Sequence, residues 1–215
     1  MARISKLRDK RSFRRKPGQK RPRSITLIVC EGETESEYFA AARVRYGLTT
    51  AEVVLADNTE GSAPISVVKC DEKRSAEPGS YDKIFCVFDR NGHQSFGDAR
   101  AKIVALASRK KRPLSIAEAI SIPCFETWVL LHFERTDAAF VSCDEVIRRI
   151  REQHMANYQK ADTDAAEQLM NNVDAAIANA EWLEPRAAHN NYNPYTSVHH
   201  VLRHFESVAA QDTVS

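Results

Sequence analysis

The sequence predicts an α/β protein built on a small parallel sheet that is flanked by helices. Short apolar runs rich in β-branched residues alternate with segments whose apolar side chains have helical spacing. This alternation is typical of parallel strands joined by crossover helices. Two of the runs end on an acidic side chain, Glu31 and Asp89. Ligands bind at the carboxyl edge of open parallel sheets, so this position predicts a functional site.

Four strands and three helices are expected in the first 122 residues. The strands are predicted at 24–30, 51–56, 83–88 and 114–122, and the helices at 33–45, 64–75 and 95–111. Thr34, with Glu37 three residues later, resembles a capping box at the start of the first helix.

The chain after residue 122 is expected to be wholly helical. A strongly apolar helix is predicted from 123 to 133, followed by helices over 143–155, 162–182 and 196–209. The chain is therefore divided into a basic arm over 1–22, an α/β domain over 23–135 and a helical C-terminal region over 136–215 that packs on the sheet.

Charge is distributed unevenly along the chain. Residues 1–23 hold eleven Lys or Arg against one Asp, a net charge of +10, whereas the whole chain carries only +2 and the rest is therefore acidic. Few apolar residues interrupt the arm, which predicts disorder until a partner binds. Its cations favour sequence-independent binding to nucleic-acid phosphates, through side chains that include Arg11, Arg14, Arg15 and Lys16. The alternative is a solubilising tail, or one that docks on the chain's own acidic body.

Composition argues against several classes of protein. Hydrophobic residues make up 43 %, enough for a core, but no apolar run is long enough for a transmembrane helix or a secretory signal, so no membrane partner is expected. Five cysteines without CxxC spacing predict free thiols in a reducing cytoplasm and make zinc improbable. The histidines show neither HxH nor HExxH spacing, and His199 and His200 are expected on a helix surface. No P-loop motif is present.

The acidic residues are the candidates for chemistry. Glu31 and Asp89, at the ends of adjacent strands, could together hold a hard cation such as Mg²⁺ or Mn²⁺ against phosphate. Glu126 opens the apolar helix, where it is either a helix N-terminal charge or a buried metal ligand. For Asp89 the alternative is an ordinary acidic turn. The remaining acids of the first cluster are read as helix N-terminal charges: Glu33, Glu35 and Glu37.

Several short motifs, taken in order, resemble the RloB family of prokaryotic defence proteins, which carry a Toprim-like nuclease fold. After the basic leader come IVCEGETE (28–35) with Tyr38 and Phe39, then VFDRNGH (87–93), PCFETWVLLHF (123–133), YQK (158–160) and NPYTSVH (193–199). Each fragment is weak alone, and the set spans nearly the whole chain.

The resemblance implies a metal-dependent nuclease that acts on DNA or RNA as an anti-phage, abortive-infection effector, with an ABC/AAA-like ATPase as a possible partner. Carried onto this chain, Glu31 assists proton transfer, Asp89 is the first acid of an Asp-x-Asp pair that holds Mg²⁺, and Glu126 is a further ligand. Arg90, Lys160 and His93 are the candidates for phosphate contacts, although His93 could equally be an exposed loop residue.

One position departs from the family pattern. Asn91 stands where the second aspartate belongs, and its amide oxygen can ligate Mg²⁺ but brings no charge. This motivates a rival hypothesis, a non-catalytic nucleic-acid-binding or ATPase-regulating subunit on the same scaffold.

Overall fold

The computed structural model describes residues 24–56, 64–75, 81–90, 94–110 and 114–213. Its centre is a five-stranded sheet with the order β2-β1-β3-β4-β5. Four strands are parallel: β1 (Thr26–Cys30), β2 (Ala51–Leu55), β3 (Lys83–Asp89) and β4 (Ile116–Ile122). The α/β class predicted from the sequence is confirmed.

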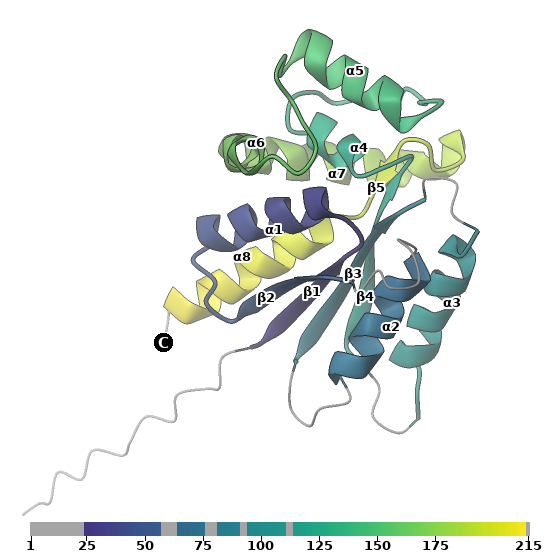
Figure 1. The fold of residues 1–215 in the computed structure, drawn as a ribbon, viewed down its shortest axis with the longest axis vertical. Coiled ribbons are helices and arrows are strands. Elements are labelled where there is room, and N and C mark those ends of the chain that lie inside the picture. Colours follow the sequence, from purple (N-terminus) through teal and green to yellow (C-terminus); the bar gives the residue numbers. More distant parts are fainter. Residues whose placement is uncertain (1–23, 57–63, 76–80, 91–93, 111–113, 214–215) are drawn as a thin grey trace, which may run out of the picture.

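Helices cover both faces of the sheet (Figure 1). One face packs against α1 (Glu33–Arg45) and α8 (His199–Thr213), and the other packs against α2 (Pro64–Ser75) and α3 (Phe96–Ala107). Because strand side chains alternate in direction, Ile28 and Phe85 join the first core, whereas Leu27 and Ile84 join the second. A sheet buried on both faces explains why these strands are continuous apolar runs.

The carboxyl ends of the strands lie beneath a second group of helices (Figure 1). These are α4 (Glu126–Leu130), α5 (Cys143–Gln153), α6 (Thr163–Leu169) and α7 (Val173–Ala187), with 3₁₀ turns η2 (Met170–Asn172) and η3 (Ala188–Asn190). The helix predicted over 123–133 is thus a single short helix. After Leu130 the chain tightens, with His132 and Phe133 donating to carbonyls three residues back. The helix predicted over 162–182 is broken by η2 and continues to Ala187.

The sequence predicted a wholly helical C-terminal region, and the structure shows that this prediction is wrong. Tyr195 and Thr196 form β5, which pairs antiparallel with the end of β4. The hydroxyls of Thr196 and Ser121 lie 3.0 Å apart, and the amide of Ile120 donates to Oγ of Ser197 at 2.9 Å. A two-residue strand is too short to give a periodic signal, so pairing with β4 defines it.

Several predictions concern residues outside the described ranges: the basic arm with Arg11, Arg14, Arg15 and Lys16, and the loop residues Asn91 and His93. Within the described part of the chain, no helix has both the length and the apolarity needed to cross a membrane.

Candidate functional site

Glu31 and Asp89 lie side by side at the carboxyl edge of the sheet. Glu31 directly follows β1 and Asp89 ends β3, and these strands are parallel neighbours. The amide of Glu31 donates to the carbonyl of Val87 at 3.0 Å, which extends the pairing by one residue. The amide of Asp89 donates in turn to Oε2 of Glu31 at 3.3 Å. The structure therefore brings together the two acids that the sequence had placed at this edge.

A third acid, Glu35, belongs to the same edge. It lies in the first turn of α1 and is only 6 % exposed. Its pKa is raised to about 7, mainly by burial, and the negative charges of Glu126 and Glu31 act in the same direction. The sequence reading had assigned Glu35 to a helix N-terminus. Its position one turn after Glu31 was the signal that could have shown it faces the same site.

Gly32 allows Glu35 to come this close. A Cβ atom at Gly32 would lie 2.7 Å from Oε2 of Glu35. Gly32 also occupies the N-cap of α1 and makes no side-chain cap, so the predicted capping box is wrong. Thr34 and Glu37 instead accept hydrogen bonds from a distant segment, from the amide of Ala161 and the hydroxyl of Thr163.

The strongest electrostatic effect falls on Asp89. The pKa of Asp89 is raised to about 8. Burial is the largest cause, and repulsion from Glu31, Glu35 and Glu126 acts in the same direction. The charge of Lys160 acts in the opposite direction. Four acids thus share one electrostatic environment. A carboxyl that is crowded by like charges holds a proton near neutral pH unless a cation takes its place.

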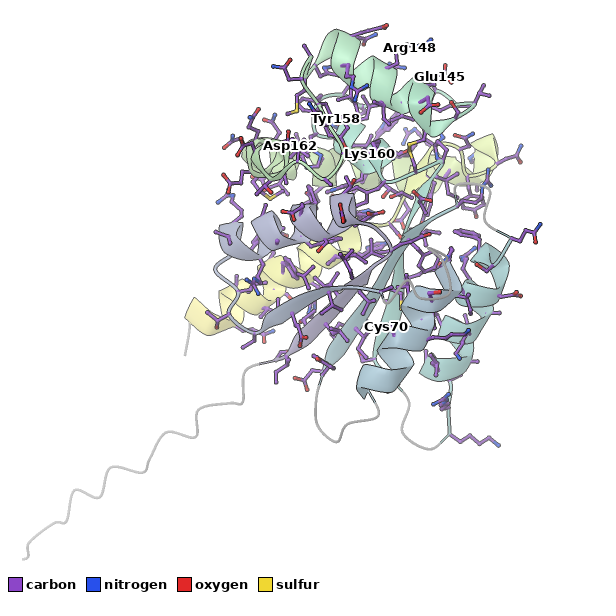
Figure 2. All side chains as sticks on the ribbon, viewed as in Figure 1. Cys70, Glu145, Arg148, Tyr158, Lys160 and Asp162 are labelled. Atoms are coloured by element: carbon purple, nitrogen blue, oxygen red, sulfur yellow. A yellow bond between two sulfur atoms is a disulfide. The ribbon has the colours of Figure 1, made fainter. Side chains whose placement is uncertain are left out.

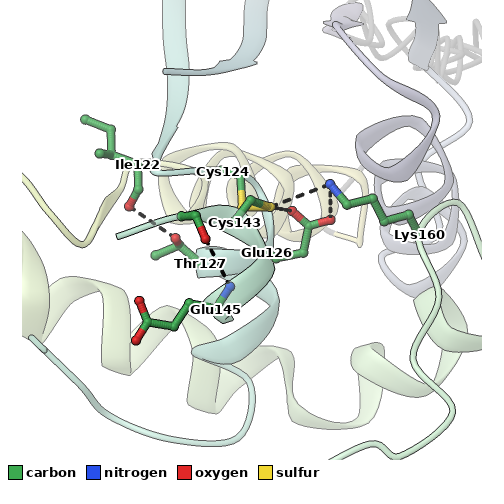
Figure 3. The surroundings of a disulfide bond; sticks show 8 residues. Ile122, Cys124, Glu126, Thr127, Cys143, Glu145 and Lys160 are labelled. Carbon is green, nitrogen blue, oxygen red and sulfur yellow. Dashed lines mark hydrogen bonds and ion pairs between the residues drawn. A yellow bond between two sulfur atoms is a disulfide. The ribbon is translucent and has the colours of Figure 1, made fainter. Parts of the chain in front are cut away.

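Glu126 is completely buried at the first position of α4. The preceding turn is fixed by the hydroxyl of Thr127, which donates to the carbonyl of Ile122 at 3.1 Å (Figure 3). Nζ of Lys160 lies 3.0 Å from Oε1 of Glu126 and forms an ion pair with it. Glu126 is therefore a helix N-terminal charge that is also buried, and its role as a metal ligand stays a prediction.

Lys160 reaches this site on an anchored loop between α5 and α6. Nε of Arg151 donates to the carbonyl of Tyr158 at 2.9 Å, and the amide of Ala161 donates to Oγ1 of Thr34 at 3.1 Å. Ala161 has a φ of 55°, a left-handed conformation that reverses the chain there. Figure 2 shows Tyr158, Lys160 and Asp162 on this loop, between α5 and α1.

Cys124 and Cys143 form a disulfide beside this ion pair (Figure 3). Sγ of Cys143 lies 3.0 Å from Oε2 of Glu126 and 3.6 Å from Nζ of Lys160. The prediction of free thiols is wrong for these two residues. The pair has no sequence motif, because the loop between α4 and α5 folds Cys143 back onto Cys124. Cys30, Cys70 and Cys86 are not part of this disulfide, and Cys30 and Cys86 are buried as expected from their strands.

The other predicted contact in the described residues is Arg90. Its side chain is exposed directly beside Asp89, and its amide donates to the carbonyl of Ser121 at 3.1 Å. A shallow pocket adjoins the Lys160 loop, lined mainly by apolar side chains of α1, α4 and α6. Tyr158 lies in its wall, and its buried hydroxyl has no hydrogen-bond partner in the described structure.

Two comparisons found nothing, since neither the curated proteins nor the solved structures include a match. A third comparison is positive: the model of the RloB-like protein family matches residues 26–205. This range includes every strand of the sheet and the four acids at its carboxyl edge. The chain therefore belongs to the family of RloB-like proteins.

Proposed function

We propose that this protein is a metal-dependent nuclease of the Toprim type that hydrolyses phosphodiester bonds in DNA or RNA. The observation that carries the proposal is the convergence of Glu31, Glu35, Asp89 and Glu126 at the carboxyl edge of a parallel sheet. The raised pKa values of Glu35 and Asp89 reflect burial together with repulsion that the neighbouring Lys160 does not cancel. A hard divalent cation would relieve this repulsion.

The donor set suits Mg²⁺ or Mn²⁺. Carboxylate oxygens are the protein ligands that these ions prefer, and Mg²⁺ commonly takes only one or two of them beside water and phosphate. Asp89 and Glu31 are the first candidates for ligands of the ion, and Glu126 and Asn91 are the next. Glu35 is a further candidate. When bound, the ion would stabilise negative charge that develops on the scissile phosphate.

The chain's own residues supply the remaining steps. Glu31, held by the amide of Asp89, is placed to accept a proton from an attacking water. Arg90 is exposed beside Asp89 and can contact phosphate, and the cationic arm would raise the local concentration of nucleic acid. The family resemblance supports a cytoplasmic role in anti-phage defence with an ABC/AAA-like ATPase partner.

The test is cleavage of plasmid DNA and of total tRNA with Mg²⁺ or Mn²⁺, with the wild type beside two variants. Asp89→Asn should lower the cleavage rate at least 100-fold. Asp98→Asn is the matched control, because this exposed aspartate on α3 belongs to no part of the acidic edge, and its rate should equal that of the wild type. Equal cleavage by Asp89→Asn and the wild type would refute the nuclease assignment.

The second candidate is a non-catalytic nucleic-acid-binding or ATPase-regulating subunit. Two observations favour it. Lys160 already forms an ion pair with Glu126 within the protein. Asn91 brings no charge to the site. This candidate predicts salt-dependent binding of nucleic acid without cleavage in any metal, and binding that survives Asp89→Asn. Filter binding at two salt concentrations, measured on the same samples as cleavage, distinguishes the two.

A further inference from the structure

We infer that Glu184, His199 and His200 form a binding site for a divalent transition-metal ion of the Zn²⁺ class, between α7 and α8. Glu184 lies near the end of α7, and the two histidines open α8. The ligand atoms of these three side chains all lie within 4.8 Å of one another. The inference is independent of the proposed nuclease activity.

The distances match the coordination sphere of such an ion. Nε2 of His200 lies 3.0 Å from Oε1 of Glu184, and Nε2 of His199 lies 3.4 Å from Oε2 of Glu184. Tetrahedral zinc with bonds of about 2.0–2.1 Å to nitrogen and oxygen separates its donor atoms by roughly 3.3 Å. Two imidazoles and one carboxylate are also a donor set that zinc enzymes use, with a fourth position left for water.

His199 brings a buried imidazole to this cluster. It is only 1 % exposed, and neither of its ring nitrogens has a hydrogen-bond partner in the described structure. Buried polar atoms are almost always paired, because leaving one unpaired is unfavourable. A metal ion at Nε2 would satisfy the ring atom that already faces Glu184.

The two rings are turned toward the same point. Side chains of consecutive helical residues normally diverge, yet the ring centroids of His199 and His200 lie only 4.0 Å apart at an interplanar angle of 41°. Nε2 of each ring faces the carboxylate of Glu184.

The cationic side chain of Arg203 forms hydrogen bonds with two other acids. Nε of Arg203 donates to Glu181 at 2.8 Å and its Nη1 donates to Glu206 at 2.9 Å. Glu184 thus keeps its two carboxylate oxygens directed at the imidazoles. Because Glu181 lies on the same helix and is also exposed, it provides a matched control for charge.

The experiment is a titration of the reduced, full-length protein, without a polyhistidine tag, with Zn²⁺ against a chromogenic chelator. Co²⁺ absorption serves as the second measurement, because its visible bands report tetrahedral coordination. Glu184→Gln and His200→Ala should each weaken Zn²⁺ binding at least 100-fold, whereas Glu181→Gln should bind as the wild type does. Circular dichroism checks that both variants, which change the half-buried Glu184 and the exposed His200, remain folded.

Three outcomes would overturn the inference. The first is no stoichiometric Zn²⁺ binding by the wild type, which would leave an ion pair. The second is equal binding by the wild type, Glu184→Gln and His200→Ala. The third is binding lost in Cys143→Ser or in Asp89→Asn but kept in Glu184→Gln, since Cys124, Glu126 and Cys143 also place their ligand atoms within 4.8 Å.

Discussion

The amide of Asp89 donates to the carboxylate of Glu31 at 3.3 Å, so the orientation of Glu31 depends on the backbone of β3 and not on the Asp89 side chain. The two acids are therefore coupled through charge but separable by mutation. A substitution that removes the charge of Asp89 should leave Glu31 in place, which makes Asp89 the position of choice for experiments on this edge.

Asp89→Asn should stabilise the metal-free protein at pH 8. The change removes one of four mutually repelling charges, and a gain of about 1–2 kcal/mol, or a few degrees in Tm, is expected. The proposed metal site predicts that millimolar Mg²⁺ raises the Tm of the wild type but not that of Asp89→Asn. Differential scanning fluorimetry with and without Mg²⁺ measures both effects, with Asp98→Asn as the unaffected control. A lower Tm for metal-free Asp89→Asn would show that repulsion does not dominate there.

Stability of the metal-free protein should fall as pH rises from about 4 to about 8. Over this range Asp89, with a pKa raised to about 8, and Glu35, with a pKa raised to about 7, keep protons in the folded state that they lose in the unfolded state. The folded state binds more protons, so the free energy of unfolding decreases with pH. Urea denaturation at several pH values measures the slope. The double variant Asp89→Asn/Glu35→Gln should flatten it, and an equal slope in that variant would contradict the assignment.

Lys160→Met should destabilise the protein by leaving the carboxylate of Glu126 without its cation. Removing one partner of a fully buried pair costs about 3–5 kcal/mol, and about 1–3 kcal/mol is expected here because the Lys160 side chain is half exposed. Adding Glu126→Gln to Lys160→Met should recover most of the loss. Urea denaturation of the four proteins in this double-mutant cycle gives the coupling energy. A coupling near zero would mean that the ion pair contributes nothing.

Gly32→Ala should disturb the acidic edge more than the fold. The new methyl group would meet Oε2 of Glu35 at 2.7 Å, so the carboxyl must move away from Glu31. A Tm change within a few degrees and a loss of Mg²⁺-dependent stabilisation are expected. Gly97→Ala is the control, because a Cβ there meets no atom within 4 Å. Unchanged Mg²⁺ dependence in Gly32→Ala would show that Glu35 is dispensable.

Reduction of the Cys124–Cys143 disulfide should lower the free energy of unfolding by about 3 kcal/mol, the value for a loop of this length. Denaturation with and without a thiol reductant measures the loss, and Cys143→Ser should show no further response to reductant. The variant Cys70→Ser is the control for a free thiol. Identical curves for the wild type in both conditions would mean that the bond is not formed in solution.

The parallel core of the fold could be predicted because its central strands, β1 and β3, are apolar runs and because helical segments separate the strands. Glu31 and Asp89 were found for the same reason, since each directly ends such a run. Contacts between distant segments could not be predicted in this way. Lys160 meets Glu126, and Cys143 meets Cys124, only because the loops on either side of α5 fold back on α4.

Burial was the other quantity that the sequence could not supply. His199 was expected on a helix surface, but α8 packs against α7, and the ring is buried. The sequence predicted that Glu35 is an ordinary helix N-terminal charge, and the structure shows that it is buried beside other acids. In both cases the residue type was visible, and its chemical environment came from tertiary packing.

The pairing of β5 with β4 has a consequence for synthesis of the chain. Within the described structure β4 has β3 on one side and β5 on the other, and β5 is made of Tyr195 and Thr196. While the chain is being translated, the outer side of Ser121 and Ile122 at the end of β4 stays unpaired until Tyr195 and Thr196 have left the ribosome. An open strand edge is a template for association with other chains. The nascent protein thus depends on β5, more than 70 residues further along the chain, to cover this end of β4.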